Sequence, residues 1–323
     1  MKQRAVGSSG LKVSQLGLGT MTWGVETDPD EAAAQLVAFH DAGGTLVDTA
    51  ASYGYGETET ILGQLVADVV PRVDLVIASK AGITRTAEGR FVDASRGALL
   101  RQLDASLRKI GTDYLDLWYV HTVDDTVPFD ETLAAVDHAV TSGRVRYAGV
   151  SNYCGWRLGR AAAWQRAVPG RAPIVANQVR YSLVDRGIER EVVPACAALG
   201  VGIFPWSPLG GGVLTGKYRD GVPADSRAAA GRPVPLPMHD QAAAAGIVEA
   251  VATAAEGLAT SPVAVALAWL RDRPEVAAPI LGARTLGQLT GALASESLDL
   301  PREIRDALDD VSAPPVGYPE DVH

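Results

Sequence analysis

The sequence predicts an α/β fold, an eight-stranded parallel (β/α)8 TIM barrel, on three observations. Eight short runs are mostly apolar and β-branched on both faces, as expected of strands that are covered on both sides. Helical patterns separate these runs, and most strand starts recur about 30 residues apart, which is the length of one βα unit. No linker divides the pattern, so we expect residues 1–323 to form a single domain.

The predicted strands and helices alternate along the chain. The strands are residues 15–20, 45–50, 74–80, 114–121, 144–152, 173–179, 201–208 and 276–283. The helices are residues 30–41, 58–67, 95–110, 130–141, 156–166, 188–199, 241–258, 262–272 and 286–293. Gly43, Gly111 and Gly143 follow helical patterns, where a left-handed residue commonly ends a helix. Ser261 followed by Pro262 is typical of a helix start.

Two segments depart from the repeat. Residues 5–13, with Gly-Ser-Ser-Gly at 7–10, predict an N-terminal hairpin that closes the bottom of the barrel. The seventh and eighth strands start at 201 and 276, which predicts an insertion after strand seven with an irregular loop at 231–237. An open doubly wound sheet is the alternative fold, but the sequence has no G-x-G-x-x-G motif and no division into halves.

Composition and charge exclude several classes of protein. A hydrophobic fraction of 47% with 21% charged residues is typical of a globular chain and not of a disordered one. The net charge of −9 argues against nucleic-acid binding. Cys154 and Cys196 match neither a disulfide framework nor a zinc spacing, so we expect no metal site. No apolar run reaches the roughly 18 residues of a membrane span, and no signal core follows the N-terminus, which predicts a soluble cytoplasmic protein.

Chemistry is expected where the barrel strands end, because active sites of such barrels lie at that face. Asp48, Lys80 and His121 end strands, and Tyr53 follows Asp48. Lys80 closes an apolar run, so its ammonium requires a carboxylate, for which Asp48 is the candidate. A cation near Tyr53 is expected to lower its pKa below the ordinary value of about 10. Tyr53 would then be a general acid near neutral pH, with His121 as a second donor to a carbonyl oxygen.

In these segments the sequence resembles the aldo-keto reductase family, including its potassium-channel β-subunit-like branch. The matching segments are 48–54 (DTAASYG), 78–80 (ASK), 116–121 (DLWYVH), 149–152 (GVSN), 177–178 (NQ), 206–209 (WSPL), 216–218 (GKY) and 282–285 (GART). They occur in the family's order between Leu16 and about Leu293, and their combination is specific although each is short. The resemblance implies an NADPH-dependent oxidoreductase that reduces aldehyde and ketone carbonyls to alcohols.

The resemblance also implies roles for individual residues. Asp48, Tyr53, Lys80 and His121 match the catalytic residues, with Tyr53 as the proton donor. The residues matched to NADP binding are Gly19, Thr20, Met21, Asp48, Ser151, Asn152, Gln178, Trp206, Ser207, Pro208, Leu209, Gly211, Lys217, Arg227, Gly282, Arg284 and Gln288. Ser151, Asn152 and Gln178 correspond to carboxamide contacts, and Trp206 to the residue that stacks on the nicotinamide.

Further along, Ser207, Leu209, Gly211 and Lys217 correspond to a loop over the pyrophosphate. Arg284 and Gln288 correspond to contacts with the 2′-phosphate and the adenine. The family's Glu-Asn pair after Gln288 is replaced here by Gly291-Ala292, so one adenine contact is expected to be missing.

Alternative functions remain open from the sequence alone. One is a cofactor-binding regulatory subunit, although the complete set of four catalytic residues favours catalysis. Another is a dedicated reductase of keto-sugars or secondary metabolites. Residues 211–217 (GGVLTGK) nearly match a nucleotide-triphosphate loop, but Tyr218 replaces the required Ser or Thr. The substrate is expected to be a small carbonyl compound contacted by Trp23, Phe129, segments 82–92 and 220–239 and the tail 314–323, none of which identifies it.

Overall fold

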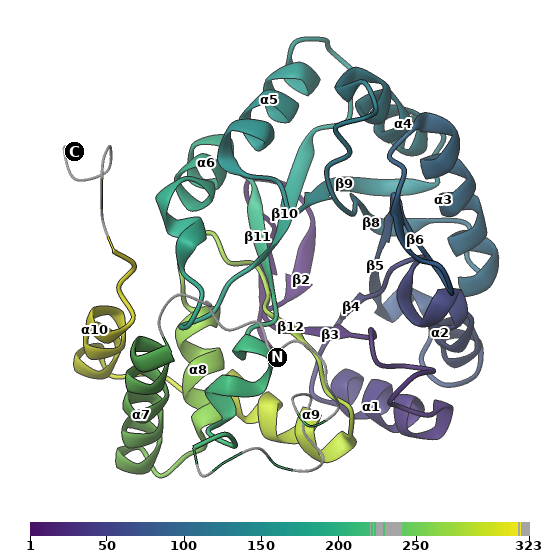
Figure 1. Ribbon diagram of the computed structural model, residues 1–323. Coiled ribbons are helices and arrows are strands. Elements are labelled where there is room, and N and C mark those ends of the chain that lie inside the picture. Colours follow the sequence, from purple (N-terminus) through teal and green to yellow (C-terminus); the bar gives the residue numbers. More distant parts are fainter. Residues whose placement is uncertain (220, 222, 224–228, 230–240, 316, 318–323) are drawn as a thin grey trace.

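The protein is a nearly closed barrel of eight parallel strands with helices around its outside, as Figure 1 of the computed structural model shows. The structure describes residues 1–219, 221, 223, 229, 241–315 and 317. The barrel strands are β3 (Gly17–Gly19), β4 (Leu46–Asp48), β5 (Val76–Ala81), β8 (Leu115–Val120), β9 (Val145–Ser151), β10 (Ile174–Arg180), β11 (Gly202–Trp206) and β12 (Ile280–Leu281). The ring closes where Val276 and Ala277 meet Ile203 of β11. The predicted (β/α)8 barrel is therefore confirmed.

Helices connect and cover these strands. They are α1 (Pro29–Asp41), α2 (Glu57–Asp68), α3 (Arg96–Ile110), α4 (Phe129–Thr141), α5 (Gly155–Arg166), α6 (Val192–Leu199), α7 (Gln241–Gly257), α8 (Pro262–Arg271), α9 (Leu286–Leu293) and α10 (Arg302–Val311). Short 3-10 helices are η1 (Tyr53–Gly56), η2 (Arg72–Asp74), η3 (Gly187–Arg190), η4 (Gly210–Thr215) and η5 (Ala294–Ser297). The predicted helix ends are confirmed: Gly43, Gly111 and Gly143 have positive φ, and the Ser261 hydroxyl accepts from the Ala264 amide.

Three elements differ from the sequence prediction. The helix predicted at 188–199 is divided into η3 and α6 by Glu191, whose φ is −135° and whose carboxylate accepts a hydrogen bond from the Trp156 amide at the start of α5. The segment 82–92, expected as a loop, contains the antiparallel hairpin β6 (Ile83–Thr86) and β7 (Gly89–Val92). Helix α10 was not predicted, although Ile304, Leu308 and Val311 have the helical spacing.

The N-terminal hairpin closes the barrel at the amino ends of its strands, as predicted. Its strands are β1 (Gln3–Ala5) and β2 (Lys12–Ser14), which pair antiparallel, and β2 crosses the barrel opening in Figure 1. Val6, Leu11 and Val13 are buried in one cluster with interior barrel residues such as Leu46 and Phe204. A second, larger cluster fills the space between the strands and the surrounding helices.

The insertion after strand seven contains η4 and α7, whereas the loop predicted at 231–237 lies outside the described residues. Among the described helices, no single one is long and apolar enough to cross a bilayer. Residues Ala244–Gly257 and Pro262–Arg271 reach that length only together, and they are bent by 102° at their junction. Helix α8 is buried in the core along most of its length.

The contact between the hairpin and the barrel can be tested at Gly7. Its φ is +53°, and a Cβ there would lie 2.2 Å from the carbonyl oxygen of Gly200. Gly111 has a φ of +70° with nothing within 4 Å of an added Cβ, so Gly111→Ala measures backbone strain alone, about 1–2 kcal/mol. We expect Gly7→Ala to lower the urea midpoint of unfolding by clearly more than Gly111→Ala. An equal decrease of the urea midpoint in the two variants would contradict close packing of the hairpin against the barrel.

Candidate active site

The interior of the barrel is built in layers, because alternate residues of each strand face inward. The lower layer is apolar and includes Leu46, Ala78, Leu117, Ala176, Phe204 and Ile280. Two residues further along the same strands, at or just past their carboxyl ends, stand Asp48, Lys80, Tyr119, Gln178, Trp206 and Gly282. Strand alternation thus gathers residues from six strands at one face, and all of them except Tyr119 were predicted as site residues.

Lys80 and Asp48 form a buried ion pair at the centre of this layer. The Lys80 Nζ lies 2.6 Å from Asp48 Oδ1, and the two side chains are 0% and 3% exposed. The ammonium also donates to the Thr49 carbonyl at 2.8 Å and to the Tyr53 hydroxyl at 3.2 Å, which uses all three of its donors. Burial lowers the pKa of Lys80, but the charge of Asp48 and the contact with Tyr53 raise it more, so the net pKa is raised and the amine is charged.

Tyr53 lies in η1, directly after β4, with its ring 4.8 Å from the Lys80 ammonium. The expectation that its pKa falls below the ordinary value is wrong. Burial raises the pKa of Tyr53, and the opposing effect of Lys80 does not overcome it. The phenol is therefore protonated at neutral pH, and its oxygen already accepts a hydrogen bond from Lys80. Its own proton is left available for another acceptor.

His121 follows β8, and its ring stands edge-on to that of Tyr53 with 6.0 Å between centroids. Burial lowers the pKa of His121 well below 6.5, and the positive charges of Lys80, Arg90 and Arg85 lower it further. The imidazole is therefore neutral at physiological pH. Its Nδ1 is buried and has no hydrogen-bond partner among the described residues.

A hydrogen-bond network joins the predicted catalytic residues to the predicted cofactor residues. The Gln178 amide donates to Asp48 Oδ2 at 2.8 Å, and the Ser151 hydroxyl donates to the Gln178 carbonyl at 3.0 Å. The Asn152 amide donates to Ser151 Oγ and to the His121 carbonyl, while its oxygen accepts from Trp206 Nε1 at 3.1 Å.

The network has consequences for where a nicotinamide could bind. The nicotinamide carboxamide could use the Gln178 Oε1 and the Ser151 oxygen, whereas both amide N–H groups of Asn152 and one of Gln178 already have partners. The guanidinium of Arg180 lies 5.8 Å from the Trp206 ring centroid, so a stacked ring would take the opposite face.

The loop after β11 suits a dinucleotide pyrophosphate. Gly210, Gly211 and Gly212 all have positive φ, a conformation in which successive amides form anion-binding concavities. A Cβ on Gly212 would lie 3.1 Å from the Lys217 Nζ, so glycine lets the ammonium approach the backbone. The hydroxyl of Tyr218 is buried without a partner among the described residues. The predicted loop residues Ser207, Pro208 and Leu209 precede these glycines, whereas Arg227 lies outside the described residues.

The predicted binding site for the adenosine half of the cofactor lies in the loops after β12 and β3. Arg284 is half-buried, and its guanidinium lies 3.7 Å from the Glu26 carboxylate. Its amide donates to Gln288 Oε1 at 2.9 Å, and the Leu286 amide donates to the Glu31 carboxylate. Two carboxylates, those of Glu26 and Glu31, therefore lie beside the segment that the sequence matched to the 2′-phosphate and the adenine.

The remaining predicted residues lie on the same rim. Gly19 pairs with Asp48, and the Thr20 amide and hydroxyl both donate to the Asp48 carbonyl. Met21 is 47% exposed. Gly282 is exposed, with nothing within 4 Å of an added Cβ.

Sequence reasoning missed two features of the site. Tyr119, the register partner of Lys80 on β8, is fully buried with its ring centroid 6.0 Å from the Lys80 ammonium. Its position two residues past Leu117 was a usable signal. Arg85 and Arg90 of the β6–β7 hairpin act electrostatically on His121, and Arg85 also acts on Tyr53.

Comparison with known proteins finds one family and several similar chains. A model of the "Aldo/keto reductase family" matches residues 15–313. The chain is 35% identical to "Uncharacterized oxidoreductase YrpG" of Bacillus subtilis over 98% of both chains. It is 34% identical to "Probable voltage-gated potassium channel subunit beta" of Oryza sativa subsp. japonica, over 90% of this chain and 89% of the relative. It is 32% identical to "Norsolorinic acid reductase B" of Aspergillus parasiticus, over 97% of this chain and 84% of the relative.

This chain belongs to the aldo/keto reductase family. The family generally uses NAD(P)H, and the oxidoreductase relatives support carbonyl reduction as the general chemistry.

The protonation state of His121 is directly measurable. Because its pKa is lowered in the folded state, His121 is expected to be uncharged from pH 6.5 upward. In ¹⁵N-histidine NMR spectra, its signals should not shift between pH 6.5 and 8, with a His121→Gln spectrum to assign them. A midpoint near 6.5 would show that solvent, and not burial, sets the pKa.

Proposed function

We propose that this protein is an NADPH-dependent reductase of aldehyde or ketone carbonyls, with Tyr53 as the proton donor. The observation that supports this most strongly is the hydrogen bond from Lys80 to the Tyr53 oxygen within a buried, fully partnered cluster. That bond occupies a lone pair of the phenol and leaves its proton for a carbonyl oxygen. When bound, NADPH supplies the hydride that adds to the carbonyl carbon.

Residues of this chain would stabilise the negative charge that develops on the carbonyl oxygen during the reaction. The mouth of the barrel is the open face at the carboxyl ends of its strands. A carbonyl oxygen bound there would accept hydrogen bonds from the Tyr53 phenol and from the neutral His121 imidazole. As the Tyr53 proton moves to the oxygen, the phenolate that remains lies beside the Lys80 ammonium, which stabilises it. Asp48 holds that ammonium in place, and Gln178 donates a hydrogen bond to the Asp48 carboxylate. Solvent then returns the proton to Tyr53.

The choice of NADPH over NADH rests on Arg284. A guanidinium binds a phosphate in bidentate fashion, and NADH has no 2′-phosphate to offer. Lys217 beside the three positive-φ glycines would hold the pyrophosphate common to both cofactors. The Glu26 carboxylate near Arg284 would oppose the 2′-phosphate, so we expect a moderate preference for NADPH.

A regulatory role is the second candidate, favoured by the similarity to a protein named as a potassium channel β subunit. Such a role needs cofactor binding but no turnover. The name of another relative, norsolorinic acid reductase, suggests a dedicated secondary-metabolite reductase, and a keto-sugar reductase is a further possibility from the sequence. We propose a small carbonyl compound as substrate and no nucleic-acid partner.

Replacing Tyr53 separates catalysis from binding. We expect Tyr53→Phe to abolish NADPH oxidation with an aldehyde while leaving the Kd for NADPH nearly unchanged, because the phenol acts on the substrate. Tyr147→Phe, far from the mouth beside Gly10, is the matched control and should behave as wild type. Wild-type rates in Tyr53→Phe would remove Tyr53 as the acid. NADPH binding without turnover of any aldehyde or ketone in the wild type would favour the regulatory role.

Cofactor preference can be tested at Arg284 and Glu26 by fluorescence titration. We expect Arg284→Ala to raise the Kd for NADPH about 10- to 100-fold and to leave the Kd for NADH nearly unchanged. Glu26→Gln removes an opposing charge and should lower the Kd for NADPH only. Equal losses for both cofactors in Arg284→Ala would mean that Arg284 supports the fold and does not bind the 2′-phosphate.

A further inference from the structure

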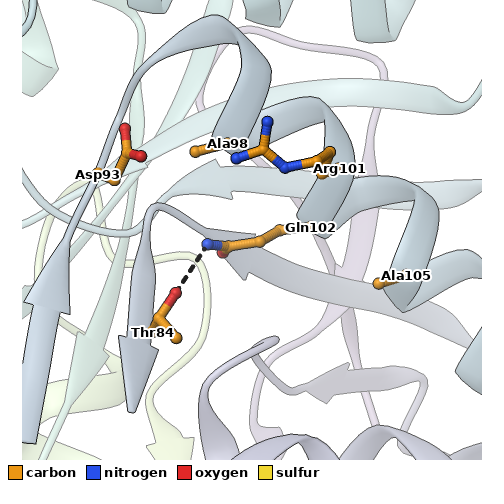
Figure 2. A pocket seen from close by; sticks show the side chains of 6 residues that line it. All are labelled: Thr84, Asp93, Ala98, Arg101, Gln102 and Ala105. Atoms are coloured by element: carbon orange, nitrogen blue, oxygen red, sulfur yellow. Dashed lines mark hydrogen bonds between the residues drawn. The ribbon is translucent and has the colours of Figure 1, made fainter. Parts of the chain in front are cut away.

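The β6–β7 hairpin has two different faces. Its register pairs Ile83 with Val92, Thr84 with Phe91, Arg85 with Arg90 and Thr86 with Gly89. The Thr84 side faces α3, because Gln102 Nε2 donates to the Thr84 hydroxyl at 3.2 Å across a cavity of about 240 Å³ (Figure 2). Strand alternation therefore turns Arg85 and Arg90 to the opposite face, away from α3.

This second face is directed toward the mouth of the barrel. Strand β6 packs against η1, the turn that contains Tyr53. The charges of Arg85 and Arg90 both lower the pKa of His121, and that of Arg85 also acts to lower the pKa of Tyr53. Arg85 is therefore close enough to act on both residues that would contact a carbonyl oxygen, and Arg90 is close enough to act on His121.

The two arginines form an unfavourable pair as they stand. Directly opposite residues in an antiparallel pair have Cβ atoms about 4.5–5.5 Å apart, and like charges there are destabilising. Neither guanidinium forms an ion pair with any residue that the structure describes. The one acidic residue of the hairpin, Glu88, is at its turn and accepts a hydrogen bond from the Thr86 hydroxyl. An anion bound between Arg85 and Arg90 would remove the repulsion.

The position of the hairpin distinguishes a substrate anion from a cofactor phosphate. The hairpin follows β5, and the glycine loop with Lys217 follows β11. In the ring order β11-β10-β9-β8-β5-β4-β3-β12, strand β5 lies four places from β11, directly across the barrel. Arg284 follows β12, next to β11 in the closed ring. The arginine pair is thus on the side away from the groups that suit the cofactor phosphates.

We propose that Arg85 and Arg90 bind an anionic group, a phosphate or a carboxylate, on a carbonyl substrate whose oxygen lies at Tyr53 and His121. This inference rests on the proposed reductase function and narrows its substrate class. Guanidinium groups bind both anions in bidentate fashion. Since both side chains are exposed, they also attract such a substrate toward the mouth of a chain with a net charge of −9.

Matched substrate pairs test the inference. NADPH oxidation is followed with glyceraldehyde 3-phosphate against glyceraldehyde, and with 4-carboxybenzaldehyde against its methyl ester. In Arg85→Gln/Arg90→Gln, we expect kcat/KM to fall about 10- to 100-fold for an anionic member, mainly through KM, and to change far less for the neutral members, with their KM nearly unchanged. The Kd for NADPH should not change. Arg101→Gln, on the α3 side of the hairpin (Figure 2), is the matched control and should have no effect.

The outcomes separate the two proposals. A loss confined to the phosphate pair, or to the carboxylate pair, supports the inference and identifies the anion. Arg85→Lys/Arg90→Lys should then recover part of the loss, and the wild-type KM for that substrate should rise with salt. Unchanged preference in the glutamine variant, with neutral aldehydes still reduced, overturns the anion site and leaves the reductase proposal intact. No reduction of any aldehyde by the wild type overturns the reductase proposal itself.

Discussion

The buried pair of Lys80 and Asp48 is the constraint on which the rest of the site depends. Removing two charges from water is costly unless every donor and acceptor of the pair is partnered. Here the ammonium has Asp48, Thr49 and Tyr53 as its three acceptors, and the second carboxylate oxygen accepts from Gln178. Satisfying one ion pair therefore fixes the position of the phenol, the turn after β4 and a side chain of β10. Loss of either charge would leave the other buried and unpaired.

The parallel barrel makes that arrangement possible. All its strands run in one direction, so a residue two positions past each apolar interior residue reaches the same level at the same face. Glycine gives the room that larger neighbours need, since a Cβ on Gly149 would lie 2.7 Å from the Tyr119 ring. At the ends of β9 and β11, Asn152 and Ser207 adopt positive φ values that non-glycine residues rarely take. Such backbone strain persists where surrounding contacts hold it, as the Asn152 hydrogen bonds do here.

Most of the barrel and much of the candidate site could be predicted from the sequence, because both follow from local pattern. Apolar runs at regular spacing define the strands, and each polar residue at a strand end occupies one known face. The pKa of Tyr53 could not be predicted, because it depends on how far burial outweighs Lys80, which only packing in three dimensions decides. The proposed anion-binding role of Arg85 and Arg90 could not be predicted for a related reason. They are five residues apart in a polar segment, and only hairpin register places them side by side.

The mouth of the barrel carries cationic residues although the chain as a whole is acidic. With a net charge of −9, the chain as a whole repels anions. Many arginines of the chain are offset by carboxylates, as in the pairs Arg157–Asp125 and Arg72–Asp116. The hairpin after β5 carries Arg85 and Arg90, and it lies across the barrel from the loops after β11 and β12, which carry Lys217 and the Glu26-paired Arg284. Because clefts lined by one sign of charge concentrate the field, an anionic substrate would be drawn to the hairpin side and an anionic cofactor to the opposite side of the barrel.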